Sequence, residues 1–295
     1  MRIFFALFFL TASLFAITGC SGFFYYPDHR VYLPPENYHI QYTDYTIESA
    51  NHVRLHVRWF PSALKETRGH ILQFHGNAEN LTSHYASLIW LINEGYDLIT
   101  FDYRGYGDSQ GKPDPEGIRN DALNTIQFVF KKTDDSKKTK KIFLYGQSIG
   151  GAILLDALTQ LKTDPGISGI ILESTFDSYK NLAIGKLSRQ WFTWIFIPLA
   201  AMIVSDATSP HGKLGKLPAG VPKLVFHGDV DMVIPEKYGL HLFNELGNPK
   251  KYILVKGGAH LNMYNLKNGI YKKDLLDFLA NAKSENLSSF DYDQQ

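Results

Sequence analysis

The chain has 295 residues, of which 44% are hydrophobic and 20% charged, and its formal net charge is +1 at pH 7. This is the balance of an ordinary globular protein, long enough to build one sizeable hydrophobic core. The chain is nearly neutral and has no long basic stripe, which nucleic-acid-binding proteins use to attract phosphate groups. We therefore expect no nucleic acid among its partners.

The N-terminus carries the pattern of an export signal. Arg2 precedes an apolar run from Ile3 to Ile17, shorter than the ~20 residues that a membrane-spanning helix needs. The run ends in "AITGC", which resembles the lipobox of bacterial lipoproteins, where lipid is attached to the cysteine after cleavage before it. The resemblance implies a signal peptide over residues 1–19 and a lipid, such as palmitate, on Cys20. An uncleaved N-terminal anchor is the alternative.

The same segment predicts a location. The positive charge before the apolar run places the rest of the chain outside the cytoplasm. We therefore expect a protein of the bacterial cell envelope, held at the membrane through a lipid on Cys20. Ser21, rather than an aspartate, would favour the outer membrane of a Gram-negative cell, facing the periplasm. Since Cys20 is the only cysteine, the domain beyond it has neither a disulfide nor a cysteine nucleophile.

Residues 20–40 include the aromatic and proline-rich stretch "GFFYYPDHRVYLPPENY", which predicts an extended, lipid-anchored tether. Its aromatic side chains either pack on the domain or lie at the membrane surface. The stretches "YTDYTIES" and "VRLHVRWF", separated by "ANH", alternate between apolar and polar residues. This alternation predicts an antiparallel hairpin.

From there on, short apolar runs alternate with helical stretches up to about residue 283, and a polar tail follows over 284–295. The runs are "HILQFHG", "YDLITFD", "KIFLYG", "GISGIILES", "PKLVFHG" and "KYILVKGG". The helical stretches include Leu81–Asn93, Pro115–Phe130 and Ile149–Leu161. Residues 41–283 are therefore predicted to form one α/β domain, a mostly parallel, doubly wound sheet led by an antiparallel hairpin.

Ser148 lies in the motif G-x-S-x-G, between a predicted strand that ends at Tyr145 and a predicted helix that starts at Ile149. The motif alone is weak evidence, but its position on a strand-to-helix turn is that of a nucleophile elbow. Side chains in place of Gly146 and Gly150 would collide across so sharp a turn. The context predicts that Ser148 is a nucleophile.

A serine nucleophile needs a base, and the base needs an acid that orients it. Asp231, in "HGDVDMVIP", and His260, in "GGAH", each follow the carboxyl end of a predicted strand. A doubly wound sheet builds its site at that edge. The order Ser148, Asp231, His260 is the order found in α/β-hydrolases.

From about Tyr42 to Leu279 the chain resembles the α/β-hydrolases, and most closely their Bem46/ABHD17-like group. The blocks that carry the resemblance are "FHGNAEN", "FDYRGYGDSQG", "YGQSIGG", "HGDVDMVIP" and "GGAH". The resemblance implies a serine hydrolase in which Asp231, not Asp229, is the acid. Glu173 remains a competing acid, with a structural hydrogen-bonding role as the expectation. The backbone N–H groups of Asn77 and Ile149 would form the oxyanion hole.

The resemblance also implies that His75 and His227 support loops and that Asp102 pairs with Arg104. No histidine shows the spacing of metal ligands, and the predicted chemistry calls for no cofactor or metal. We expect cleavage of carboxylic esters or thioesters, with a small acyl-ester or lipid-like substrate and an acyl-enzyme intermediate. An aminopeptidase or acyltransferase would use the same triad. A non-catalytic lipoprotein scaffold is the alternative outside enzymes, although such proteins usually lose a triad member.

Residues 178–210, between the predicted strand that ends at Glu173 and the block that holds Asp231, fill the slot where this fold usually carries a lid. Its apolar side chains are Trp191, Phe192, Trp194, Ile195, Phe196, Leu199 and Met202. They would line an acyl-chain pocket, meet a membrane, or pack the lid onto the body of the domain.

Overall fold

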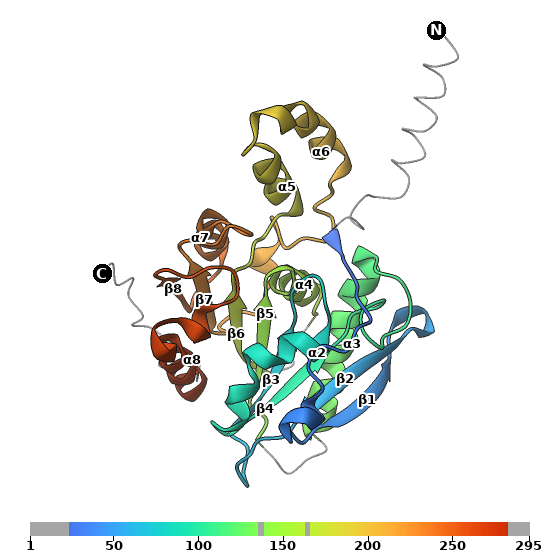
Figure 1. Cartoon of the computed structure of the whole chain (residues 1–295), viewed down its shortest axis with the longest axis vertical. Coiled ribbons are helices and arrows are strands. Elements are labelled where there is room, and N and C mark those ends of the chain that lie inside the picture. Colours follow the sequence, from blue (N-terminus) through green and yellow to red (C-terminus); the bar gives the residue numbers. More distant parts are fainter. Residues whose placement is uncertain (1–23, 135–138, 163–165, 283–295) are drawn as a thin grey trace.

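An eight-stranded sheet forms the centre of the molecule, in the strand order β1-β2-β4-β3-β5-β6-β7-β8 (Figure 1). The computed structural model describes residues 24–134, 139–162 and 166–282, so the predicted signal peptide, Cys20 and the C-terminal tail lie outside the described residues. The strands are β1 Thr43–Glu48, β2 Arg54–Phe60, β3 Gly69–Phe74, β4 Tyr96–Phe101, β5 Ile142–Gln147, β6 Ile167–Glu173, β7 Lys223–Gly228 and β8 Lys250–Val255.

The predicted hairpin and parallel sheet are both confirmed. β1 pairs antiparallel with β2 and β2 antiparallel with β4, whereas β4, β3, β5, β6, β7 and β8 pair in parallel. Strands β3, β4, β5 and β7 are buried along their whole length, which explains their continuous apolar runs.

Helices cover both faces of the sheet (Figure 1). The α-helices are α2 Leu81–His84, α3 Pro115–Asp134, α4 Ile149–Leu158, α5 Tyr179–Leu187, α6 Ile197–Ile203, α7 Glu236–Glu245 and α8 Ile270–Asn281. The 3₁₀ turns are η2 Pro35–Tyr38, η3 Ala50–His52, η4 Tyr85–Ser87, η5 Ile89–Ile92, η6 Trp191–Phe196, η7 Leu214–Lys216 and η8 Met263–Gly269.

The sheet separates two hydrophobic cores. Leu144 of β5 belongs to the core shared with α3 and α4, whereas its neighbours Phe143 and Tyr145 belong to the core shared with α8. This alternation follows from the two-residue period of a strand. Among the described residues, no helix combines the length and apolar character needed to cross a membrane.

The prediction of one continuous helix over Leu81–Asn93 is wrong. Only α2 is α-helical there, and the 3₁₀ turns η4 and η5 follow it. The buried side chains in this stretch are Tyr85, Leu88 and Leu91, three residues apart. A period of three is that of a 3₁₀-helix, which places all three on one face, whereas an α-helix would rotate them apart.

The segment between Phe24 and Ile40 lies against the domain. Tyr25 is buried in the core around α4, and the side-chain amide of Asn80 donates to the carbonyl groups of Asp28 and Arg30, at 3.0 and 2.7 Å. Tyr26 is 61% exposed. The described part of the predicted tether is thus docked on the body of the domain.

The lid consists of α5, η6 and α6 and stands at one end of the molecule, beyond the carboxyl edge of the sheet (Figure 1). The seven apolar side chains named above are 50 to 83% exposed, with Phe196 least and Met202 most exposed. The interpretation that they pack the lid onto the body is therefore wrong.

The predicted pairing of Asp102 with Arg104 is also wrong. Arg104 pairs with Asp121 of α3, at 2.8 Å from Nη2 to Oδ1, and with Asp114 at 3.2 Å. Asp102 instead accepts the backbone N–H of Leu81 at 2.7 Å. Asp102 thus stabilises the first turn of α2, and Arg104 neutralises the fully buried carboxylate of Asp121.

We expect Asp121→Ala to lower the free energy of unfolding by about 3–5 kcal/mol, because it leaves the buried Arg104 guanidinium without its main partner. Urea unfolding measures this change. Asp277→Ala, which breaks the exposed pair with Lys273, is the matched control and should leave the midpoint almost unchanged. Equal effects of the two substitutions would contradict the assignment.

Candidate active site

Ser148 occupies a sharp turn between β5 and α4. Its backbone has φ 54° and ψ −125°, a conformation that costs a residue with a side chain about 1–3 kcal/mol. Contacts from the next strand hold the turn: Ser148 N–H donates to the Glu173 carbonyl at 2.9 Å, and the Thr175 hydroxyl donates to the Ser148 carbonyl at 2.6 Å. The strained turn presents the serine hydroxyl at the carboxyl edge of the sheet.

Three glycines make this turn possible. A Cβ on Gly146 would lie 2.5 Å from the Cα of Gly151, and a Cβ on Gly150 would lie 2.2 Å from the carbonyl oxygen of Phe74. A Cβ on Gly151 would lie 2.5 Å from the hydroxyl oxygen of Thr175. The expectation that side chains here would collide is confirmed.

Ser148, His260 and Asp231 form one hydrogen-bonded row. His260 Nε2 lies 3.0 Å from Ser148 Oγ, and His260 Nδ1 lies 2.8 Å from Asp231 Oδ2. The three residues follow β5, β8 and β7 respectively, so they meet at the carboxyl edge of the sheet, as the sequence predicts. Ser148 and Asp231 are buried, and the His260 side chain is 18% exposed.

The second oxygen of Asp231 is held by its own loop. Oδ1 accepts the backbone N–H groups of Val233 and Ile234, at 2.9 and 2.8 Å. Burial alone would raise the pKa of Asp231, but the hydrogen bonds from His260 and from these N–H groups outweigh it and hold the pKa below its usual value. The carboxyl group is therefore ionised at neutral pH and is fixed beside the imidazole.

Asp229 and His227 support this loop, as expected. Asp229 accepts the backbone N–H of Gly257 at 2.7 Å, which joins the loops after β7 and β8. His227 lies 2.8 Å from the carbonyl oxygen of Ile234 through Nε2, and burial lowers the pKa of its imidazole. Neither residue contacts Ser148.

Glu173 does not reach His260. Its Oε2 accepts hydrogen bonds from Gln147 Nε2 at 2.7 Å and from the Tyr145 hydroxyl at 3.0 Å. The Tyr145 hydroxyl also contacts that of Tyr264, at 2.7 Å. Burial raises the pKa of Glu173. The structural role expected for Glu173 fits this network, whose tyrosines and glutamine the sequence analysis missed.

The loop after β3 lies beside the nucleophile. A Cβ on Gly76 would lie 3.6 Å from the Cβ of Ser148, so the next residue, Asn77, borders the same space. His75 braces this loop: its Nδ1 lies 2.8 Å from the carbonyl oxygen of Gly76, and its ring stacks on His84 at 5.1 Å. Burial, together with His75, lowers the pKa of His84 to about 3, so both rings stack without charge repulsion at neutral pH.

The Asn77 side chain is fixed from outside the loop. Its Oδ1 accepts the backbone N–H of Tyr26 at 2.9 Å and the hydroxyl of Tyr106 at 3.0 Å. Within the described part of the chain, the backbone N–H groups of Asn77 and Ile149 donate to no other residue. Two free donors thus flank Ser148. Sequence patterns do not reveal the contact from Tyr26, because it joins residues 51 positions apart.

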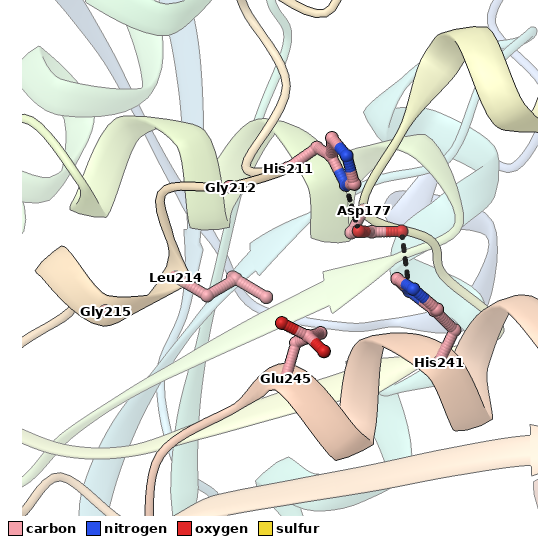
Figure 2. A pocket seen from close by; sticks show the side chains of 7 residues that line it. All are labelled: Asp177, His211, Gly212, Leu214, Gly215, His241 and Glu245. Carbon is pink, nitrogen blue, oxygen red and sulfur yellow. Dashed lines mark hydrogen bonds and ion pairs between the residues drawn. The ribbon is translucent and has the colours of Figure 1, made fainter.

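Acidic and imidazole side chains also gather around a cavity of about 310 Å³ at the base of the lid (Figure 2). Asp177, just before the lid, lies 2.8 Å from His211, just after it, and 3.5 Å from His241 of α7. These groups pair with one another and tie the two ends of the lid together. In residues 24–134, 139–162 and 166–282, no group of three or more His, Cys, Asp or Glu is arranged to hold a metal ion.

The chain is similar to known proteins in sequence and in fold. A family model described as "Serine aminopeptidase, S33" matches residues 65–205. The esterase Pf2001 of Pyrococcus furiosus has the same fold, with a TM-score of 0.66 and 18% identity, covering 86% of this chain and 95% of that one. The chain has the fold of the α/β-hydrolases. The predicted fold class is confirmed, and the family model and the esterase and lipase relatives agree on a serine hydrolase of this fold.

Two sets of relatives extend the similarity. The chain is 29% identical over 287 residues to the uncharacterized protein YfhR of Escherichia coli (strain K12), with 95% of each chain covered. It is 29% identical over 250 residues to the lysophosphatidylserine lipase ABHD12 of Xenopus tropicalis, covering 78% of this chain and 62% of that one. The family model ends at residue 205, so its match does not include Asp231 or His260.

We expect Gly150→Ala to displace the turn at Ser148, because the added methyl group meets backbone oxygens that cannot move aside. The free energy of unfolding should fall by about 1–3 kcal/mol. Ester hydrolysis should fall by roughly 100-fold, the cost of misplacing a reacting atom by about 1 Å. Gly247→Ala is the control, since nothing lies within 4 Å of a Cβ at that position. Full activity in Gly150→Ala would contradict a rigid elbow.

Proposed function

We propose that this protein hydrolyses carboxylic esters or thioesters, with Ser148 as nucleophile, His260 as base and Asp231 as the orienting acid. The observation that carries the proposal is the continuous row from Ser148 Oγ through His260 to Asp231, with both distances at 3.0 Å or below. A hydroxyl group is a weak nucleophile unless a base removes its proton as it attacks, and this row supplies that base.

The proposed reaction has two halves. Ser148 Oγ attacks the acyl carbonyl while His260 Nε2 takes its proton, and the backbone N–H groups of Asn77 and Ile149 bind the oxyanion. His260 returns the proton to the leaving alcohol or thiol, which leaves an acyl group on Ser148. Water then attacks this ester, loses its proton to His260, and releases the acid and the free serine. Asp231 stays ionised throughout and stabilises the imidazolium.

Apolar side chains beside the triad favour an apolar acyl group. Val230, Met232 and Val233 flank Asp231 and are 52, 76 and 45% exposed. The names of the relatives, an esterase and a lysophosphatidylserine lipase, point to the same kind of bond. We propose a small acyl-ester or lipid-like substrate on this basis.

The matching family model is described as a serine aminopeptidase, which favours peptide-bond cleavage as a second candidate. Peptidase and acyltransferase would use the same three residues and differ in the leaving group or the acceptor. A non-catalytic scaffold is disfavoured because the elbow glycines and all three site residues are present.

We further propose that the protein belongs to the Bem46/ABHD17-like group and that Cys20 carries a lipid that holds it in the bacterial cell envelope. The lipobox-like sequence "AITGC" supports the anchor. Radiolabelled palmitate incorporated by the wild-type chain and not by Cys20→Ser would establish it.

Turnover of p-nitrophenyl esters, from acetate to palmitate, tests the proposed activity on the full-length chain. We expect Ser148→Ala to lower kcat at least 10⁴-fold, since the nucleophile is absent. Ser188→Ala, an exposed serine of the lid, is the control and should retain full activity. A residual rate in Ser148→Ala equal to that of the wild type would assign the activity to another group. The best chain length would identify the acyl group.

The identity of the acid is tested by two isosteric changes. Asp231→Asn should lower kcat on the order of 10⁴-fold, because the amide stabilises the wrong tautomer of His260. Glu173→Gln should retain activity within about 10-fold, since Glu173 contacts Gln147 and Tyr145 rather than His260. The reverse ranking of the two variants would make Glu173 the acid.

A further inference from the structure

The lid carries an apolar surface that no described residue covers. We call it the lid surface; its members are Trp191, Phe192, Trp194, Ile195, Phe196, Leu199 and Met202. Three of them, Trp191, Ile195 and Met202, are 77, 77 and 83% exposed. Exposing large aromatic and aliphatic side chains to water is unfavourable in free energy. A patch of such side chains therefore marks an interaction surface.

The lid contacts the edge of the active site. The Arg189 guanidinium donates through Nη1 to the backbone carbonyl of Met232 at 3.0 Å, which joins the lid to the loop that holds Asp231. Met232 is itself 76% exposed. The lid is therefore attached to the loop that borders the catalytic row, and both carry exposed apolar side chains.

Cationic residues outnumber carboxylates in the lid. Between Ser178 and Pro210 the chain has Lys180, Lys186 and Arg189 and a single carboxylate, Asp206, which accepts a hydrogen bond from the Ser178 hydroxyl at 2.7 Å. Exposed aromatic and aliphatic residues combined with nearby cations are the composition of segments that lie on anionic lipid surfaces.

The N-terminal end of the described chain lies at the base of the lid (Figure 1). The ring of Phe24 packs on that of Tyr179, the first residue of α5, at 5.0 Å, and the Tyr25 hydroxyl lies 3.3 Å from that of Tyr179. Phe24 is four positions after Cys20, so the Cα atoms of the two residues lie at most about 14 Å apart. A lipid on Cys20 thus holds the bilayer close to Phe24, at the base of the lid.

From these observations we propose that the lid surface docks on the lipid bilayer, with the active site facing the membrane surface, so that the substrate is an acyl lipid drawn from the bilayer. The docking rests on the proposed anchor at Cys20, and the choice of substrate rests on the proposed hydrolase activity. The aromatic rings of the lid lie among the acyl chains, and the lysines and Arg189 face the lipid headgroups.

Fluorescence quenching tests the docking directly, because Trp191 and Trp194 lie on the lid and the other two tryptophans, Trp59 and Trp90, lie on the body. The full-length chain is reconstituted in phosphatidylethanolamine/phosphatidylglycerol vesicles whose acyl chains carry bromine, and only protein that floats with the vesicles is scored. We expect bromine to quench at least about half of the lid fluorescence.

The double variant Trp191→Phe with Trp194→Phe should lose the quenchable fraction while it stays bound, and Trp90→Phe should retain it. Three results would overturn the docking: a wild-type chain that fails to float, bound protein whose quenching is the same in both variants, or lid tryptophans that are shielded in a cross-linked dimer without quenching.

Rates of hydrolysis on a vesicle-borne and a soluble substrate distinguish the proposed docking from the proposed activity. The triple variant Trp191→Gln, Ile195→Gln and Met202→Gln should hydrolyse a vesicle-borne lysophospholipid about 10-fold more slowly and soluble p-nitrophenyl butyrate within twofold of wild type. Leu64→Gln with Ile270→Gln, exposed residues outside the lid, is the matched control and should change neither rate. Equal rates of wild type and triple variant on vesicles would overturn the substrate proposal. If Ser148→Ala keeps the quenching while no protein hydrolyses any ester, the docking stands and the proposed function falls.

Discussion

The active site depends on one tight turn, in which the chain reverses from β5 into α4 at Ser148 with a positive φ of 54°. The turn closes only because Gly146 and Gly150 let backbone approach backbone and Gly151 leaves room for the Thr175 side chain. The turn fixes two groups at once. It points the Ser148 hydroxyl at His260, and it places the backbone N–H of Ile149, the first residue of α4, beside that hydroxyl. The geometry of the remaining site residues is set relative to this turn.

The strain and the buried charge at the site are offset by neighbouring strands. The Glu173 carbonyl at the end of β6 and Thr175 just after it hold the turn, and the loop after β7 donates two backbone N–H groups to Asp231 Oδ1. A parallel sheet brings these loops to the same edge, because all of its strands point the same way. The buried strands therefore supply rigidity, and the loops supply the chemistry.

Much of this arrangement is predictable from the sequence because it is encoded locally. The apolar runs predict the strands, and the elbow motif predicts Ser148, because close backbone contacts require glycine wherever they occur. Asp231 and His260 follow from their places after strands. The sequence does not predict that Arg104 pairs with Asp121 rather than Asp102, or that Tyr26 fixes Asn77, since both contacts join distant segments. The 3₁₀ turns after α2 also escaped prediction, because periods of three and 3.6 are hard to distinguish over so few residues.

Mapping the site of covalent modification tests the central claim, that Ser148 is a nucleophile activated by His260. A fluorophosphonate reacts with such a serine, and peptide mass spectrometry identifies the modified residue. The account predicts a single adduct on Ser148 in the full-length protein and its loss in His260→Ala. An adduct on another residue, or no adduct on the folded wild-type protein, would contradict it.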